Sequence, residues 1–184
     1  SSPVMLSFKH NSGLGSGVAV TSDAARGSFS VEVAGATGFS AGSWVCLSLQ
    51  TKNETFVRKE MLENRYYDKA VAEGWNIADG TDGVTVQDYH QIKAVNGNTI
   101  TFCEPIMHAV DASWGWTLHS FPHYEEVGIE DLTFRGKAKD HFGHHQSWKD
   151  DGAYKPVAMT RLTNSWMRYV DFDSISEGCS VISR

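Results

Sequence analysis

Two segments in the last third of the chain superpose without a gap, and this repeat restricts the fold more than any other feature of the sequence. Val127–Phe134 lies over Ser165–Phe172, position by position. In each segment the apolar residues are spaced by three positions and then by two. A regular strand has a period of two and a helix a period between three and four, so the mixture predicts a bend followed by a short strand. The apolar positions that coincide are Ile129 with Met167, Leu132 with Val170, and Phe134 with Phe172.

A second repeat relates Val157–Arg161 to Cys179–Ser183. The offset between its two segments is shorter than the offset of the first repeat. This offset is about 22 residues, and one turn of a β-helix, built from short strands joined by bends, takes roughly 20–25 residues. The offset of the first repeat is longer than that of the second by close to the length of the polar stretch Lys137–Asp151. This stretch contains three histidines. This stretch predicts a loop inserted between one turn and the next.

Stacking follows from the apolar pattern, because a single turn of this kind cannot bury its own apolar side chains. The sequence supplies two or three such turns and stops at Val181–Arg184, within a predicted strand. An open end would expose a row of unpaired backbone groups. We therefore expect further turns to follow Arg184, in the same chain or in another one.

The first two-thirds of the chain has a different organisation. Residues 1–37 read as strands that lead into the β-helix, and residues 38–123 as an inserted, β-rich subdomain. Within it, two apolar runs that flank Asn96-Gly97-Asn98 predict an antiparallel hairpin. Residues near 54–73 contain no Gly or Pro and predict one helix. Residues 124–184 are then the β-helix turns, with the histidine-rich loop at 137–151.

Composition excludes some classes of protein. A net charge of −6 argues against nucleic acid as a partner. The sequence has no apolar run of about 18 residues, so we expect no membrane span. The three cysteines show no metal-binding spacing. They read either as buried free thiols or as a Cys46–Cys103 disulfide with one thiol left over.

A resemblance to a known family adds to this interpretation. Val127–Phe134, His144-His145, Asp151-Gly152 and Asn164–Phe172 resemble the pectate-lyase-like superfamily of right-handed parallel β-helices. The stretch from Gly38 to Ile100 looks like the small β-rich insertion of some secreted bacterial members. The resemblance implies a right-handed parallel β-helix and a secreted, periplasmic or cell-surface location in bacteria. It also implies polysaccharide degradation by a lyase or a hydrolase. The fold by itself does not select the reaction.

Candidate catalytic residues lie between Lys137 and Arg168. Polysaccharide β-elimination needs a base for the C5 proton of a uronic acid, a cation beside its carboxylate, and an acid for the leaving oxygen. His145 is the first candidate for the base, because it lies where the inserted loop returns to the next turn; His144 and His141 are alternatives. Arg161 and Lys155 complete the predicted catalytic set, Arg161 as a fork that pairs with two carboxylate oxygens.

Candidate binding residues lie in the same part of the chain. Arg168 is a second candidate for a sugar carboxylate, and exposed tryptophans stack on sugar rings through their apolar faces. The predicted substrate-binding residues are His144, Arg168, Trp166 and Trp148. Asp150 and Asp151 are candidate Ca²⁺ ligands, provided that both project from a loop; no other cofactor is expected.

Three functions fit these features. The leading hypothesis is a polysaccharide lyase that cleaves an acidic glycan by β-elimination. A glycoside hydrolase on the same scaffold is the second, because it would use paired carboxylates such as Asp171 with Asp173, or Glu125 with Glu126. The third is a non-catalytic module for carbohydrate binding or adhesion. In each case the expected partner is a polysaccharide.

Overall fold

A computed structural model describes the chain in two compact units. Unit 1 comprises Ser1–Gly13 and Pro122–Arg184, and unit 2 comprises Leu14–Phe121. Sequence reasoning placed the corresponding boundaries after residues 37 and 123. The described residues are 4–51, 55, 56, 58, 68, 72, 73, 84–137, 140, 141, 143, 150, 155–175 and 180–182.

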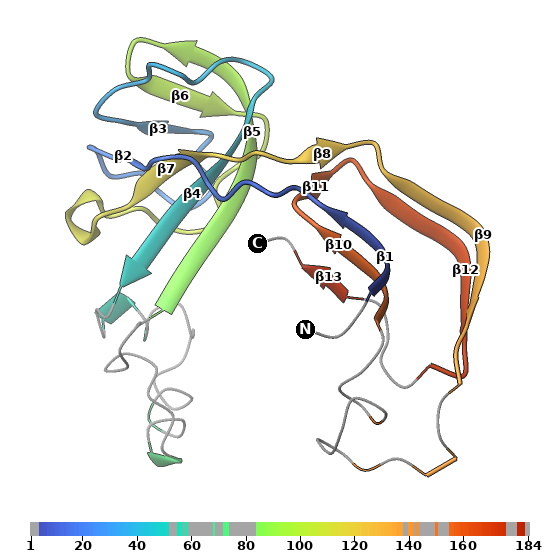
Figure 1. The fold of residues 1–184 in the computed structure, drawn as a ribbon. Coiled ribbons are helices and arrows are strands. Elements are labelled where there is room, and N and C mark those ends of the chain that lie inside the picture. Colours follow the sequence, from blue (N-terminus) through green and yellow to red (C-terminus); the bar gives the residue numbers. More distant parts are fainter. Residues whose placement is uncertain are drawn as a thin grey trace. The chain divides into compact units, whose positions relative to one another are not determined.

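Unit 1 consists of strands that pair only in parallel within its described residues (Figure 1). One sheet has the order β1-β10-β13, and two further ladders join β11 to β8 and β12 to β9. Along the chain, one strand from each ladder follows in turn: first β1, β8 and β9, then β10, β11 and β12. The strands are β1 (Val4–Lys9), β8 (Tyr124–Glu125), β9 (Gly128–Arg135), β10 (Lys155–Thr160), β11 (Leu162–Thr163), β12 (Trp166–Asp173) and β13 (Ser180–Ile182).

Both repeats predicted from the sequence appear as strand register. β12 lies on β9 with the longer offset, so that Met167 pairs with Ile129 and Phe172 with Phe134. β13 lies on β10 with the shorter offset, as in the pair of Met159 and Val181. The superposition of the two segments is therefore confirmed residue by residue.

The predicted bend is also confirmed. Asp131 in β9 and Tyr169 in β12 have φ values of 53° and 54°, in the left-handed region that non-glycine residues seldom adopt. Because they occupy equivalent positions in the repeat, the two bends stack on one another. A second stacked pair, Glu126 and Asn164, has φ values of 59° and 48° and lies at the turn before each strand. The bend inside the strand breaks the alternation of side chains, which accounts for the apolar spacing of three and then two.

The interior of unit 1 is formed by apolar residues from successive strands. Ile129, Phe134, Val157 and Met159 are buried, and Met167, Val170, Leu6 and Phe8 are among the partly buried residues that pack against them. We expected all six residues of the repeat to lie inside, and for two of them this is wrong. Leu132 and Phe172 are 46% and 38% exposed, although Phe172 stacks on Phe134 with 5.4 Å between ring centroids. Among the described strands β9 pairs only with β12, so its side chains have a neighbouring strand on one side alone.

Unit 2 is an antiparallel sheet with the strand order β2-β7-β4-β5-β6-β3. The predicted hairpin is present: β5 and β6 pair up to Asn96 and Thr99, and Gly97 supplies the positive φ of 59° that the two-residue turn needs. The strands and the single 3₁₀ turn η1 are β2 (Val18–Ala19), β3 (Ser30–Glu32), β4 (Trp44–Thr51), β5 (Val84–Asn96), β6 (Thr99–Phe102), η1 (Ala112–Trp114) and β7 (Thr117–Ser120).

The two outermost strands of this sheet are linked to each other. Val20 and Val33 form an isolated antiparallel bridge, and Thr21 N–H donates to the Glu32 carbonyl oxygen at 2.9 Å. The sheet therefore curls, and it encloses an apolar core that includes the fully buried Trp116 and Phe102. The segment that we expected to enter the β-helix, residues 1–37, instead contributes β2 and β3 to this antiparallel sheet; only β1 of that segment lies in the parallel part.

The predicted helix near 54–73 lies largely outside the described residues. The described members of this range that have helical backbone are Thr55, Phe56, Arg58, Asp68 and Ala72. In the parts of the chain that the structure describes, no helix is long and apolar enough to cross a membrane.

Two of the cysteines can be placed. Cys46 is buried and Cys103 is exposed, and neither forms a disulfide, so the alternative of a Cys46–Cys103 disulfide is wrong, as is burial of Cys103. Cys46 lies on β4, and Cys103 follows β6, on the opposite side of β5. Two strand spacings amount to about 10 Å, which exceeds the roughly 4.4–6.8 Å between α-carbons that a disulfide spans. Cys179 lies outside the described residues.

Candidate functional site

The β9–β12 ladder has an outer face on which Trp166 is held in place by the strand beneath it. Trp166 pairs with Gly128 and is 40% exposed. A β-carbon added to Gly128 would lie 2.5–2.7 Å from three adjacent atoms of the indole ring. The indole therefore covers the α-carbon of Gly128, and only glycine leaves room for it.

Glu130 is the polar centre of this face. It accepts a hydrogen bond from the indole Nε1–H of Trp166 through Oε1, and its Oε2 lies 2.8 Å from Nη2 of Arg168. The Arg168 hydrogen bond, with a smaller influence from the Trp166 hydrogen bond, holds the pKa of the Glu130 carboxyl below its ordinary value. Trp166 and Arg168, both predicted to bind substrate, are thus brought together, and one carboxylate fixes the edge of the ring and the guanidinium.

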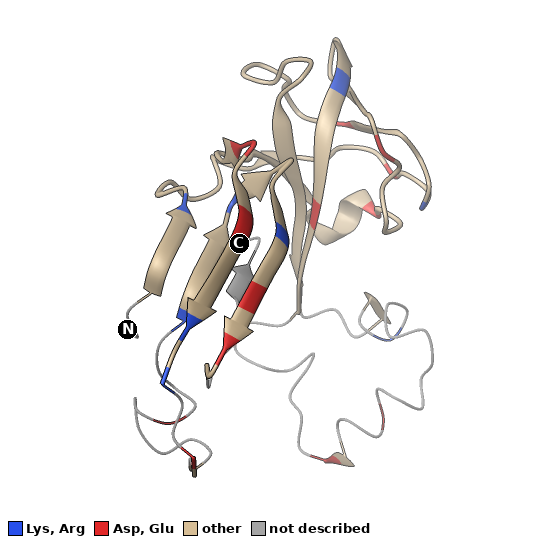
Figure 2. Ribbon diagram, turned by 90° about the vertical axis from the view of Figure 1, so that its right-hand side faces the viewer, with Lys and Arg blue, Asp and Glu red and all other residues tan. Residues whose placement is uncertain are grey.

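Further exposed groups continue along the same two strands. Tyr169, at the stacked bend, is 78% exposed. Beyond it, Arg135 Nε lies 2.9 Å from Asp173 Oδ2, and these residues are also register partners. Acidic and basic residues are interspersed on the strands of unit 1 (Figure 2). The surface therefore offers an aromatic ring beside alternating charges, a combination that suits a polyhydroxylated ligand.

The predicted catalytic residues Lys155 and Arg161 lie far apart. Lys155 begins β10, whereas Arg161 directly follows its last residue. Six residues of strand span about 20 Å, so the two side chains do not reach the same sugar ring. Arg161 has a φ of 56°, which turns the chain from β10 towards β11. Of the two, Arg161 lines a hollow, together with residues of β1 and the segment after it.

The histidine-rich loop contributes little that can be placed. Asp150 is 4% exposed and accepts a hydrogen bond from the Gly143 N–H at 3.2 Å. His141 is exposed. Among the described residues, no group of three or more His, Cys, Asp or Glu could hold a metal ion. The remaining predicted residues lie outside the described part of the chain: His144, His145, Trp148 and Asp151.

Sequence reasoning missed four residues that the structure brings to these sites. Gly128 and Glu130 hold Trp166 and Arg168, and Lys9 and His10 lie beside Arg161. For the first pair a signal existed, because the ungapped repeat already placed Gly128 opposite Trp166 and Glu130 opposite Arg168. No repeat connected β1 with β10, since most of the chain separates Leu6 from its partner Val157.

Comparisons with known proteins give structural likenesses only. No family model and no curated protein matches the chain. The tailspike protein gp49 of Pseudomonas phage LKA1 is 13% identical, over 92% of this chain and 24% of that one, with a TM-score of 0.43. For the tailspike gp61 of Pseudomonas phage phi297 the identity is 13%, over 85% and 21%, with a TM-score of 0.49.

A third similar structure contains a ligand. The tailspike Gp54 of Acinetobacter baumannii bacteriophage AP22, in complex with A. baumannii capsular saccharide, is 12% identical, over 89% of this chain and 25% of that one, with a TM-score of 0.48. The chain thus spans about a quarter of the length of these structures.

Proposed function

We propose that this chain is part of a right-handed parallel β-helix protein that binds an acidic polysaccharide outside the cell and cleaves it by β-elimination. The observation that carries the proposal is the exposed indole of Trp166, which lies over Gly128 and is held at its edge by Glu130.

A ring held in this way suits a sugar. One face of a pyranose presents C–H groups, which pack against the apolar face of an indole. Because Trp166 is fixed before the ligand arrives, little side-chain entropy is lost on binding. The neighbouring Glu130 and Arg168 supply polar groups of both signs for the hydroxyl groups at the edge of the sugar.

For the elimination step we assign two roles. Arg161 pairs with the carboxylate of a uronic acid, so that the negative charge that develops when C5 loses its proton is stabilised. His145 takes that proton, the bond from C4 to the leaving oxygen breaks as the C4–C5 double bond forms, and the leaving oxygen takes up a proton from water. His145 lies outside the described residues, and its role is proposed from the sequence. Lys155 is too distant from Arg161 to bind the same sugar.

Hydrolysis is a second candidate, favoured by one observation. Asp171 and Asp173 are two positions apart on β12 and are both exposed. They therefore project from the same face, with α-carbons about 6.7 Å apart. Glycosidases use a pair of carboxylates that flank the scissile bond, and two exposed carboxylates on one face are the observation that favours this candidate.

The chemistry is tested by incubating the protein with a panel of acidic polysaccharides. Elimination leaves an unsaturated sugar, which absorbs in the ultraviolet, and we expect this absorbance to rise together with new reducing ends. New reducing ends without this absorbance would show that the protein cleaves the polysaccharide by hydrolysis and not by elimination. Binding without either product would make the chain a non-catalytic module, and the absence of any binding would overturn the proposal.

The binding surface is tested separately. We expect Trp166→Ala to weaken saccharide binding by about tenfold, because the stacking contact is lost. Phe29→Ala is the matched control, since Phe29 is an aromatic residue of unit 2 that is 51% exposed. Equal losses in the two variants would show that Trp166 has no specific role.

A further inference from the structure

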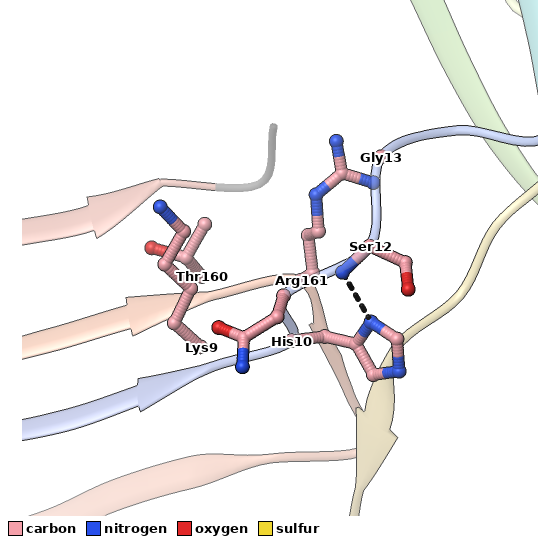
Figure 3. Close-up of a pocket in the computed structure, with 7 residues that line it drawn as sticks. Lys9, His10, Ser12, Gly13, Thr160 and Arg161 are labelled. Carbon is pink, nitrogen blue, oxygen red and sulfur yellow. Dashed lines mark hydrogen bonds between the residues drawn. The ribbon is translucent and has the colours of Figure 1, made fainter.

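A second polar site lies where β1 and β10 end. The hollow there has a volume of about 360 Å³ (Figure 3). Among the described residues that line it, two side chains are cations, one is an imidazole, and none is acidic, in a chain whose net charge is −6. The lining residues are Lys9, His10, Asn11, Ser12, Gly13, Thr160 and Arg161.

The backbone explains why the two cations meet. Lys9 and Thr160 are register partners on adjacent parallel strands, so their side chains lie next to each other. Arg161 would project to the opposite side in a regular strand. Its left-handed φ of 56° interrupts that alternation, and its guanidinium extends to the same side as the Lys9 ammonium (Figure 3).

His10 and its neighbours fix the chain that leaves β1. The Nδ1 atom of His10 accepts a hydrogen bond from the Ser12 N–H at 3.2 Å, and the ring packs against Tyr124 with 4.9 Å between centroids. In neutral His10 the proton therefore lies on Nε2. These contacts hold the 10–13 segment as one wall of the hollow, and Asn11, Ser12 and Thr160 add amide and hydroxyl donors to it.

We propose that Lys9 and Arg161 form a subsite for an oxyanion, and specifically for the carboxylate of a uronic acid residue in the bound glycan. Arg161 offers the planar fork that matches a carboxylate, and Lys9 offers a mobile point charge. The choice of a uronic acid rests on the proposed function, whereas the recognition of an oxyanion rests on the hollow itself. The site uses two successive passages of the chain, so it exists only when β1 and β10 are paired.

The test is calorimetric titration of the whole chain with a uronic acid oligomer, with the same oligomer after reduction of its carboxyl groups, and with inorganic sulfate. We expect Lys9→Gln and Arg161→Gln each to weaken binding of the acidic oligomer by about tenfold, and Arg161→Lys to weaken it less. Binding of the reduced oligomer should stay unchanged in all three variants. Lys93→Gln is the control, because Lys93 is an exposed lysine of unit 2.

Each outcome decides between the proposals. Unchanged affinity for the acidic oligomer in both Lys9→Gln and Arg161→Gln would overturn the subsite, even if Trp166 still binds sugar. Sulfate binding that these substitutions abolish, with unchanged oligomer binding, would overturn the uronic acid as ligand. If neither oligomer binds the wild-type chain, the proposed function fails, and sulfate binding that depends on Lys9 and Arg161 would still support the oxyanion site. Circular dichroism shows whether each variant keeps the wild-type fold.

Discussion

Glu130 Oε2 and Arg168 Nη2 lie 2.8 Å apart and belong to residues that face each other directly in the β9–β12 ladder. Glu130 thus binds the guanidinium of Arg168, which the sequence predicted to bind a sugar carboxylate. Because Arg168 is exposed to water and Glu130 is partly exposed, a ligand carboxylate can compete with Glu130 for Arg168. Arg168 therefore pairs with a ligand carboxylate through Nη2 only when Glu130 gives way.

Protonation of Glu130 should loosen this arrangement at acidic pH. Its pKa is lower in the folded chain than in the unfolded one, so the stabilisation is complete above the ordinary value of 4.5 and is lost as the pH falls through the lower folded pKa. We expect the indole N–H resonance of Trp166 to shift over that range in a proton NMR titration. Glu130→Gln should remove the shift, and an unchanged shift in this variant would show that another group causes it.

Gly128→Ala tests whether the indole of Trp166 requires a residue without a side chain beneath it. The added methyl group would overlap the ring, so Trp166 must move. We expect a loss of about 1–3 kcal/mol in the free energy of unfolding, together with weaker saccharide binding. Chemical denaturation and titration measure the two effects. Gly35→Ala is the control, because its new β-carbon would meet no atom within 4 Å; equal behaviour of the two variants would contradict the packing described.

Phe134 and Phe172 should differ in their contribution to stability although they stack on each other. Phe134 is 5% exposed and Phe172 is 38% exposed. We expect Phe134→Ala to lower the free energy of unfolding by about 3–5 kcal/mol and Phe172→Ala by about 1–2 kcal/mol. Urea denaturation gives both values. A larger loss of unfolding free energy for Phe172→Ala than for Phe134→Ala would contradict the burial of Phe134 and the partial exposure of Phe172.

Unit 2 contains a buried acid whose ionisation should affect stability. Asp88 Oδ2 accepts a hydrogen bond from the Met107 N–H at 2.8 Å and lies 3.0 Å from His90 Nε2, although the latter contact is poorly aligned for a hydrogen bond. Burial raises the pKa of Asp88, but the contact with His90, the Met107 hydrogen bond, and the charges of His90 and His108 together outweigh it, so the pKa lies below 3.8.

The sign of the pH effect follows from that direction. The ionised Asp88 stabilises the fold above about pH 3.8, and this contribution is lost as the pH falls through the lower folded pKa. We expect the melting temperature of the wild type to drop more steeply than that of Asp88→Asn below pH 3.8. Thermal scans by circular dichroism across that range provide the comparison, and parallel curves would exclude Asp88 as the group responsible.

Cys46 and Cys103 should react with a thiol reagent at different rates. Cys103 is exposed and Cys46 is fully buried on β4. A thiol reagent should label Cys103 in the folded chain and Cys46 only after denaturation. Variants with a single one of these cysteines assign each reaction. Rapid labelling of Cys46 in the folded chain would contradict its position in the sheet.

The parallel ladder was predictable from the sequence because stacking repeats the same environment. Met167 takes the place of Ile129 one passage later, and Phe172 that of Phe134, so the pattern of apolar residues reveals the register. The pairing of β1 with β10 was not predictable, because the whole of unit 2 lies between these two strands along the chain. The strands of residues 18–33 were assigned to the wrong sheet, since alternation indicates a strand but not its partner.

The candidate site was predictable only in part. Trp166 and Arg168 were proposed from their residue types, but their shared contact with Glu130 depends on the side chains that the ladder brings opposite one another. Arg161 was also proposed, yet the direction of its side chain depends on a left-handed φ. Arginine has no intrinsic preference for that conformation, so the sequence carries no signal for it.

The register of β12 on β9 is the basis of the Trp166 surface and of the stacked interior, and disulfide trapping measures it most directly. Thr133 and Asp171 are exposed register partners, so cysteines at these positions in a background without the three native cysteines should cross-link readily under mild oxidation. The shifted pair Thr133→Cys and Asp173→Cys should not, because two residues along a strand add about 6.7 Å. Cross-linking of the shifted pair in preference to the direct pair would contradict the ladder.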